Sequence, residues 1–297
     1  MPPTAPALAA DGLCKHFGPV RALQDLSLRI EHGEIVGFLG PNGAGKTTTI
    51  RLLLGLLAPT SGTATVLGGT VTLGRARWRT DVGYLPGEVA FWPGLTGRQT
   101  LDFLARLARR PPVDRPDLLD RLGLDAATLG RHVRTYSDGM RQKLGLVQAL
   151  QCRPRLALLD EPTKGLDPLV QQAFYELVAD ARRQGMTLFV SSHVLTEIER
   201  LCDRVAMLRL GKLVFAGDVE DVRRTQRRRV IAVFADDVDH EALAHFGTVL
   251  ESTPRRITLL VAQEGLPALV ARLGMLPLAD LVVEPPSLEE AFLERYR

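Results

Sequence analysis

Cysteine is scarce in this sequence, and long apolar runs are missing. The chain of 297 residues has three cysteines, far apart and without CxxC spacing: Cys14, Cys152 and Cys202. An odd number of separated cysteines indicates free thiols in a reducing compartment and not a disulfide framework. No stretch approaches the roughly 18 apolar residues that span a bilayer, and the N-terminus lacks the basic start of a signal peptide. We therefore expect a soluble, cytoplasmic protein. If it works at a membrane, a partner chain would supply the membrane-spanning segment.

A strong charge of one sign is also missing. The formal net charge is +3, and 45% hydrophobic with 24% charged residues are typical of a globular chain. This balance gives no indication of nucleic-acid binding. The one dense basic run, residues 223–229, is interpreted as a solvated connector, because charge runs usually lie at the surface. It separates two predicted domains, residues 1–222, with a helical subdomain near 88–152, and residues 229–297.

The most informative stretch is a glycine-rich loop with the pattern G-x-x-x-x-G-K-[ST]. An apolar strand at residues 34–39 precedes it, and an apolar helix at 47–57 follows it. Glycines allow a tight turn whose backbone N–H groups surround a polyphosphate, and the helix N-terminus adds partial positive charge. Lys46 would reach the β- and γ-phosphates, and the Thr47 hydroxyl would bind Mg²⁺. The predicted nucleotide-binding residues here are Gly40, Pro41, Asn42, Gly43, Ala44, Gly45, Lys46, Thr47 and Thr48.

Two adjacent carboxylates follow an apolar strand that begins at residue 155. Asp160 can hold Mg²⁺ through water while Thr47 binds it directly, and Glu161 can orient and deprotonate an attacking water. The alternative, an exposed strand end, fits poorly with the preceding leucines. His193 ends the next buried strand. A lone histidine there is usually a core residue, but its place after the carboxylate pair favours a catalytic role.

Three other features point to binding surfaces. Ser137 is a good N-cap, and with Gly139 beside it predicts a second anion-binding helix end. Phe17, before a Gly-Pro turn, suits stacking on a purine and packing in the core equally well. A proline-flanked loop holds the only adjacent pair of large aromatics, Phe91 and Trp92. We interpret this apolar loop as a docking surface.

Periodicity predicts an α/β fold. Buried strands that end in ligand residues indicate a doubly wound parallel sheet, and alternating strands at residues 12–20 and 22–30 predict an antiparallel layer beside it. The predicted helices of the middle third span residues 100–109, 116–122 and 137–150. Beyond the basic run the pattern is β-α-β-β-α-β, a small α+β domain that ends in a predicted helix at residues 287–292.

Taken in order, these motifs resemble those of the ATPase subunits of ABC transporters, over roughly residues 8–219. The resemblance implies a P-loop ATPase cassette with a parallel core sheet, an antiparallel β layer and a helical subdomain. It implies that Gly40–Thr47 form the Walker A loop, with Lys46 in catalysis, that Leu156–Asp160 form the Walker B strand, and that Glu161 is the catalytic glutamate. Ser137–Met140 would be the signature that contacts the other subunit's nucleotide, and Asp167 the D-loop aspartate. His193 would be the switch histidine and Phe17 the adenine-stacking aromatic.

The same resemblance implies partners and cofactors. It predicts a head-to-tail dimer that holds two ATP molecules with Mg²⁺ at its interface, and a separate permease docked near Phe91 and Trp92. The C-terminal domain and its PSLEEAF ending are similar to those of drug- and antibiotic-export subunits, which would place the chain on the inner face of the cell membrane. The alternative is a soluble ABC-type ATPase acting on nucleic acid or ribosomes. Such proteins usually have two cassettes, coiled-coil insertions or zinc cysteines, and this sequence has none. An idle binding module would lack Lys46 or Glu161.

Two positions depart from the family pattern. The usual LSGGQ signature is replaced by YSDGM, in which Asp138 would repel a polyphosphate unless its side chain points away. The glutamine expected after Tyr84-Leu85-Pro86 is replaced by Gly87, followed by Glu88. That glutamine normally helps hold Mg²⁺ and senses the permease. Either Glu88 substitutes for it, which is our hypothesis, or the contact is absent.

Overall fold

The computed structural model describes residues 5–74, 77–220 and 227–284. The chain divides into two compact units, Met1–Val219 and Glu220–Arg297. The division predicted from the sequence lay slightly later, between residues 222 and 229. The predicted helix at residues 287–292 and the first part of the basic run lie outside the described residues.

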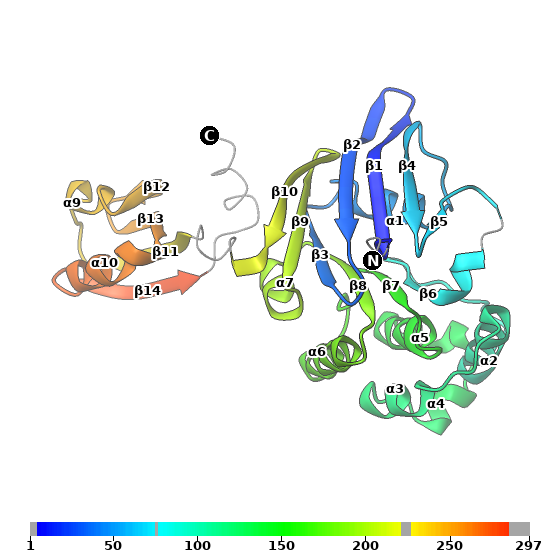
Figure 1. The fold of residues 1–297 in the computed structure, drawn as a ribbon. Coiled ribbons are helices and arrows are strands. Elements are labelled where there is room, and N and C mark those ends of the chain that lie inside the picture. Colours follow the sequence, from blue (N-terminus) through cyan, green and yellow to red (C-terminus); the bar gives the residue numbers. More distant parts are fainter. Residues whose placement is uncertain (1–4, 75–76, 221–226, 285–297) are drawn as a thin grey trace. The chain divides into compact units, whose positions relative to one another are not determined.

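The first unit is built on a six-stranded sheet (Figure 1). Its strands, in spatial order, are β10 (Lys212–Asp218), β9 (Arg204–Arg209), β3 (Ile35–Leu39), β8 (Thr187–Ser192), β7 (Leu156–Asp160) and β6 (Val82–Leu85). All neighbours are parallel except β10 and β9. Strands β3, β7 and β8 are buried throughout, because both faces of the sheet are covered. The predicted doubly wound core is confirmed, and the carboxyl ends of its parallel strands share one edge.

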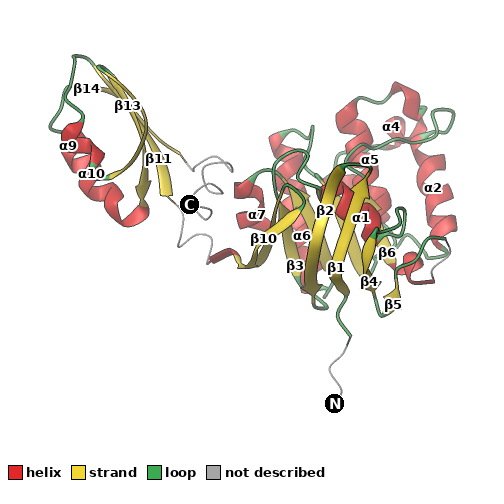
Figure 2. Cartoon of the chain, turned by 90° about the horizontal axis from the view of Figure 1, so that it is seen from above, coloured by secondary structure: helices red, strands yellow, loops and turns green. Residues whose placement is uncertain are grey.

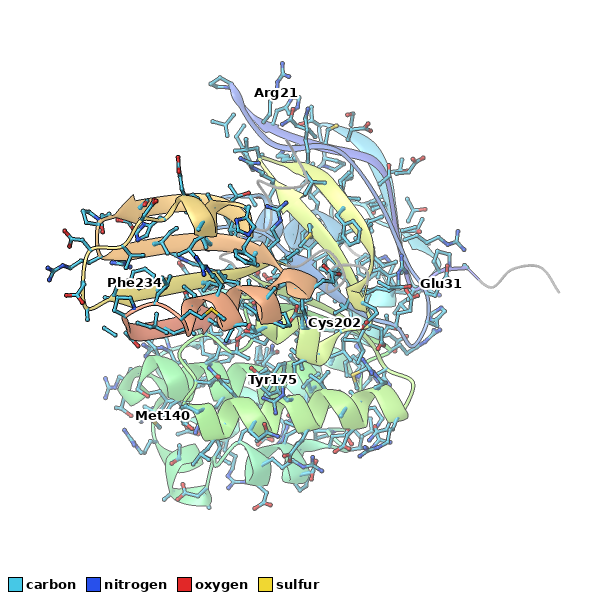
Figure 3. All side chains as sticks on the ribbon, turned by 90° about the vertical axis from the view of Figure 1, so that its left-hand side faces the viewer. Arg21, Glu31, Met140, Tyr175, Cys202 and Phe234 are labelled. Carbon is cyan, nitrogen blue, oxygen red and sulfur yellow. The ribbon has the colours of Figure 1, made fainter. Side chains whose placement is uncertain are left out.

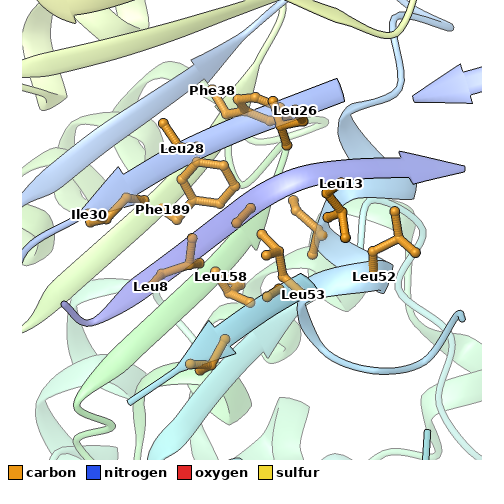
Figure 4. Close-up of a cluster of buried hydrophobic side chains, with 14 of the residues drawn as sticks. Leu8, Leu13, Leu26, Leu28, Ile30, Phe38, Leu52, Leu53, Leu158 and Phe189 are labelled. Carbon is orange, nitrogen blue, oxygen red and sulfur yellow. The ribbon is translucent and has the colours of Figure 1, made fainter. Parts of the chain in front are cut away.

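A smaller antiparallel sheet covers one face of this core. Its strands are β2 (Val20–Ile30), β1 (Leu8–Phe17), β4 (Ser61–Val66) and β5 (Gly69–Thr70). Helix α1 (Lys46–Leu53) packs with both sheets, and one apolar cluster joins all three elements. Figure 4 shows this cluster, in which Phe38 and Phe189 of the parallel sheet lie beside Leu28 of β2. The antiparallel layer predicted from the alternating pattern is therefore present.

The remaining described helices of the first unit lie in the connections between strands of the parallel sheet. They are α2 (Gly97–Ala108), α3 (Arg115–Arg121), α4 (Ala126–Gly130), α5 (Asp138–Leu150), α6 (Pro168–Arg183) and α7 (Leu195–Leu201), with short 3₁₀ helices η1 (Arg77–Asp81) and η2 (Val133–Thr135). Helix α2 begins before its predicted start because Thr96 and Gln99 form a capping box. Helix α1 ends earlier than predicted, with Gly55 in the left-handed region just beyond it. None of the described helices is both long and apolar enough to cross a membrane.

The second unit is a four-stranded, fully antiparallel sheet with helices on one face (Figure 2). Its elements are β11 (Arg227–Phe234), α9 (Glu241–Ala244), β12 (Gly247–Thr253), β13 (Arg256–Ala262), η3 (Gln263–Gly265), α10 (Leu266–Leu273) and β14 (Leu278–Glu284). Alternate residues of β11 and β13, among them Val230 and Leu259, form a core with Leu269 of α10. The predicted β-α-β-β-α-β order is confirmed, although α9 is shorter than expected.

Candidate active site

The loop between β3 and α1 is packed so closely that two of its glycines have no room for a side chain. Gly45 has φ +110°, and a Cβ there would lie 2.5 Å from the carbonyl oxygen of Ala22. A Cβ on Gly40 would lie 2.4 Å from the carbonyl oxygen of Leu208. Larger residues would push the loop away from the strands behind it, so the glycine pattern has a direct steric cause.

A cavity of about 500 Å³ opens over this loop. The cavity is lined by Val20, Arg21, Ala22, Gln24, Asn42, Gly43, Gly45, Lys46, Thr47, Thr48, Glu161, Leu210 and Gly211. The lining therefore combines the predicted phosphate loop with the start of β2 and the turn between β9 and β10. Its volume lies in the usual range for small-molecule sites.

Lys46 lies at the floor of the cavity, with a residue exposure of 6%. Its ammonium donates to the carbonyl oxygens of Gly40 at 2.6 Å and Pro41 at 3.2 Å, and lies 3.7 Å from Glu161 Oε1. Burial lowers the pKa of Lys46, and the charges of Glu161 and Asp160 oppose that shift. A buried ammonium held only by carbonyls and one carboxylate gains further stabilisation from a polyphosphate.

Asp160 and Thr47 are brought together from opposite sides of the loop. The Thr47 hydroxyl donates to Asp160 Oδ2 at 2.7 Å, and the Ser191 hydroxyl donates to Asp160 Oδ1. Asp160 is almost fully buried. The described residues contain no group of three or more His, Cys, Asp or Glu able to hold a metal. A carboxylate and a hydroxyl alone suit Mg²⁺, because this ion usually retains waters and takes phosphate oxygens as its other ligands.

Glu161 and His193 face each other at the sheet edge. Glu161 has φ +51°, a left-handed conformation, and its N–H donates to the hydroxyl and carbonyl oxygens of Ser191, both at 3.1 Å. His193 Nδ1 lies 3.3 Å from Glu161 Oε1. The His193 side chain is 47% exposed, which excludes the alternative that it is a core histidine. The structure thus joins Lys46, Glu161 and His193 in one chain of contacts.

The position of the missing glutamine is also close to Asp160. A Cβ on Gly87 would lie 3.1 Å from Asp160 Oδ2, so the backbone at Gly87 passes beside the predicted metal-binding carboxylate. Glu88 is exposed. Tyr84 of β6 is partly buried, and burial together with the Asp160 charge raises the pKa of its phenol.

The residues predicted to form the signature and the D-loop do not line the cavity of their own chain. Ser137 caps α5 by accepting from Met140 N–H at 3.2 Å, and Asp167 caps α6 by accepting from Val170 N–H at 3.0 Å. Asp138 is highly exposed, and its carboxylate pairs with Arg141. Arg141 therefore compensates the charge that departs from the usual signature.

Gly139 and Phe17 also lie outside the cavity lining. A Cβ on Gly139 would lie 2.9 Å from the carbonyl oxygen of Gly165, so α5 and the segment after Glu161 approach closely there. Phe17 is about half exposed, with the Lys15 ammonium 4.9 Å from its ring centroid. That exposure leaves part of the ring accessible and excludes a fully packed core position.

Three site-supporting residues were missed by the sequence reasoning. Ser191 holds Asp160 and Glu161, as described above. Gln142 is buried and donates from Nε2 to the carbonyl oxygens of Glu161 at 3.1 Å and Pro162 at 2.9 Å. Glu197 accepts hydrogen bonds from two hydroxyls next to the catalytic segments. The only available signal was a polar residue within an apolar pattern, in a strand for Ser191 and in helices for Gln142 and Glu197, and such a residue does not identify its partner.

The aromatic loop after β6 leads into an apolar surface on α2. Trp92 is 52% exposed and packs edge-on against Phe103, with ring centroids 5.1 Å apart. Phe103 and Leu107 are exposed on the same helix. Nearby, a cavity of about 350 Å³ lies between α2 and β6, with Leu104, Leu107 and Tyr84 in its lining.

Family models match both units of the chain. A model described as ABC transporter matches residues 23–164. A model described as EvrA-like ABC transporter, C-terminal domain, matches residues 226–284. Both matches fall within the units that the structure separates.

Similar proteins extend these matches over nearly the whole chain. The chain is 34% identical to the uncharacterized ABC transporter ATP-binding protein YdbJ of Bacillus subtilis, over 97% of its own length and 95% of that protein. It is 36% identical to the bacitracin transport ATP-binding protein BcrA of Bacillus licheniformis, over 73% of this chain and 71% of that protein. A solved ATP-binding subunit of an ABC transporter has a TM-score of 0.68 and 30% identity, covering 73% of this chain and 92% of that chain. The predicted cassette fold is confirmed.

Proposed function

The chain belongs to the ATP-binding subunits of ABC transporters, which bind and hydrolyse ATP, and from this premise we propose that it closes as a dimer on MgATP and thereby moves a separately encoded permease. The observation that carries this proposal is the contact chain Lys46–Glu161–His193 at the cavity, beside the Asp160–Thr47 pair. A lysine that binds phosphate charge, a general base and a hydrogen-bond donor for the developing charge are groups that promote γ-phosphate hydrolysis.

These side chains have distinct tasks in hydrolysis. The oxygen of a water bonds to the γ-phosphorus, the bond to the β–γ bridging oxygen breaks, and Glu161 takes the proton of the water. Lys46 leaves the carbonyls of its own loop and donates to phosphate oxygens. His193, which lies 3.3 Å from Glu161, donates to the charge that develops on the γ-phosphate.

Asp160 and Thr47 are the residues that would hold Mg²⁺. Their oxygens already lie 2.7 Å apart, and Ser191 orients the carboxylate from its other side. The ion, when bound, neutralises part of the phosphate charge. Both ligands are oxygen atoms, as Mg²⁺ prefers, and water and phosphate oxygens would complete its coordination shell.

Dimerisation is supported by the residues outside the cavity. Ser137, Gly139 and Asp167 are placed at helix starts but do not line their own nucleotide cavity. In a head-to-tail dimer Ser137 and Gly139 contact the γ-phosphate held by the other copy. Asp138 does not oppose this contact, because Arg141 pairs with its carboxylate. Phe17 would then stack on the adenine from the near side of the cavity.

Permease docking is supported by the exposed aromatic surface. Trp92 is 52% exposed beside the partly buried Phe91, and Phe103 extends the surface along α2 toward a neighbouring cavity. Exposed apolar patches of this kind mark protein–protein contacts. The direction is export, supported by the match of the second unit to an EvrA-like C-terminal domain and by the name of the bacitracin relative. The chain then works on the inner face of the membrane that holds its permease.

The test is the purified full chain with Glu161→Gln, compared with the native chain in the presence of MgATP. We expect hydrolysis to fall by about 10² to 10⁴-fold, because the base is lost while the shape of the side chain is kept. ATP binding should persist, and the variant should accumulate as an ATP-bound dimer. Turnover and mass in solution are measured on the same samples, with Glu176→Gln on the exposed face of α6 as the control.

A monomeric Glu161→Gln chain, under conditions where the native chain hydrolyses ATP, would contradict the dimer mechanism. Unchanged hydrolysis would contradict the role of Glu161. The two results are distinguishable because mass and turnover are separate measurements.

A further inference from the structure

Glu197 connects the two segments that carry the proposed catalytic side chains, although it has no role in the proposed mechanism itself. It lies in the first turn of α7. Its Oε1 accepts from the Thr163 hydroxyl at 2.6 Å, and its Oε2 accepts from the Ser192 hydroxyl at 2.6 Å. Both distances are short for O–H donors and are typical of bonds to an ionised carboxylate. One side chain therefore ties together two loops that are far apart in sequence.

The two hydroxyls are placed directly beside the reacting groups. Thr163 follows Glu161 by two residues, and Ser192 precedes His193 by one. Both Thr163 and Ser192 are buried. The carbonyl oxygen of Ser192 also accepts from the N–H of Gly40 at 3.3 Å, so the same segment contacts the start of the phosphate loop. A shift of Glu197 would thus reach the base, the imidazole and the loop.

The His193 side chain has few contacts of its own, and the Glu161 backbone is strained. His193 is about half exposed, and among the described residues its polar contact is the 3.3 Å approach to Glu161. Glu161 occupies a left-handed backbone conformation that a non-glycine residue adopts only when neighbouring contacts impose it. Their positions therefore depend on the neighbouring backbone. Ser191 and Gln142 hold it at Glu161 itself, and Thr163 and Ser192 anchor the adjoining segments.

We propose that Glu197 is a positioning residue for ATP hydrolysis, which holds Glu161 and His193 in register through Thr163 and Ser192. The inference rests on the proposed roles of Glu161 and His193. Misplacement of a reacting group by about 1 Å costs on the order of 10²-fold in rate. Anchoring two loops to one carboxylate is a direct means of preventing such movement.

The surroundings of Glu197 suit this task. Tyr175 of α6, labelled in Figure 3, lies close enough for the Glu197 charge to raise the pKa of its phenol together with burial. The Arg200 guanidinium lies 4.4 Å from the Tyr175 ring centroid and donates to Gln172 of the same helix. The carboxylate thus lies between the catalytic segments on one side and α6 on the other. Stability of α7 alone, through a first-turn acid, is the competing role for Glu197.

The experiment uses the full chain and compares Glu197→Ala, Glu197→Gln, Thr163→Val and the Glu197→Ala/Thr163→Val double variant. For each we measure kcat and KM for MgATP, ATP binding by a fluorescent analogue, and the midpoint of thermal unfolding. Glu197→Ala should lower kcat by about 10 to 100-fold, with KM and analogue affinity within about twofold. Glu197→Gln keeps a carbonyl oxygen that accepts from one hydroxyl and gains an amide NH₂ that can donate to the other, so this variant should retain most of kcat. The double variant should be no slower than Glu197→Ala, because both changes break one connection.

The outcome is decided by how the measurements separate. A kcat within twofold of native for Glu197→Ala, at an unchanged unfolding midpoint, overturns the inference. A loss of kcat in proportion to ATP binding and to the unfolding midpoint also overturns it, in favour of a role in stability alone. Glu161→Gln is run beside these variants. If that variant hydrolyses ATP normally the proposed mechanism itself has failed, whereas an inactive Glu161→Gln with an active Glu197→Ala refutes only the role of Glu197.

Discussion

The two units of this chain treat buried polar groups in opposite ways. In the first unit the buried polar residues are Lys46, Thr49, Thr100, Gln142, Gln151, Asp160, Thr163, Thr187, Ser191 and Ser192. In the second, among the residues that the structure describes, Thr258 stands alone. Burial of a polar group is unfavourable unless a partner compensates it. In the first unit several of them, among them Lys46, Asp160 and Ser191, lie where the carboxyl ends of the parallel strands meet the phosphate loop.

The difference indicates where chemistry is done. Ser191 and Thr47 both donate to the Asp160 carboxylate, and Lys46 donates to the phosphate loop that leads to Thr47, so these groups form one network beside the cavity. The core of the second unit is apolar on the face covered by its helices. The residues that we propose to act in catalysis all lie in the first unit.

The largest effect that we expect is on permease binding by the proposed docking surface of the first unit. Replacing Phe91 and Trp92 together by glutamate should abolish co-purification with the permease, because charged side chains cannot enter an apolar contact without losing hydration. ATP binding should stay within about twofold, since neither residue lines the nucleotide cavity. Met275→Glu, at an exposed apolar site of the second unit, is the matched control. Equal loss in the control would contradict a docking role specific to the first unit.

The second prediction compares the two cores. Leu158→Ala in β7 and Leu259→Ala in β13 each remove a fully buried side chain and should lower the free energy of unfolding by about 2 to 5 kcal/mol. Leu259→Ala should leave kcat nearly unchanged at temperatures where the chain is folded. Leu158→Ala should reduce kcat as well, because β7 carries Asp160. Calorimetry and ATPase assays test this, and equal losses of kcat would break the distinction between the units.

The third prediction follows from the lowered pKa of Lys46, for which the second unit has no counterpart because it contains no lysine. Without ATP, the Lys46 ammonium releases its proton at a lower pH than it does in the ATP-bound site, because the phosphate charge favours the protonated form. Binding then takes up a proton, so affinity for ATP should fall as pH rises through the window below 10.5, by at most about tenfold per pH unit. Titration calorimetry in buffers of different ionisation enthalpy measures this uptake. The exposed Lys164, changed to Met, should leave the slope intact, and a flat native profile would contradict the prediction.

The smallest expected effect concerns the missing glutamine. If Glu88 substitutes for it, Glu88→Ala should lower permease-stimulated turnover by about fivefold, the lower end of typical coupling between sites, and spare the basal rate. Its exposure argues for a modest effect. Full stimulated turnover in the variant would show that this contact is absent and that Gly87 marks a departure from the usual coupling.

Much of the fold and of the reaction centre was predictable from sequence alone. The glycine pattern, Lys46 and Thr47 could be identified because a phosphate loop is a local turn whose residues are consecutive. The apolar strand before Asp160 predicted a buried parallel strand, because such strands read as unbroken hydrophobic runs. Strand and helix ends were less predictable, since caps such as Thr96 with Gln99 decide them.

Only the tertiary structure decided which distant groups meet. Thr47 and Asp160 are 113 residues apart, and their 2.7 Å hydrogen bond exists because α1 and β7 pack against each other. Gln142, Ser191 and Glu197 carry no motif of their own. Their hydrogen-bond partners lie on other elements: a backbone carbonyl for Gln142, the Asp160 carboxylate for Ser191 and a hydroxyl for Glu197. Sequence patterns report local turns and periodic burial, whereas hydrogen bonds between elements depend on the register in which a sheet and its helices pack. For that reason the sequence by itself determined the candidate reacting residues, and the tertiary structure determined how these side chains are held.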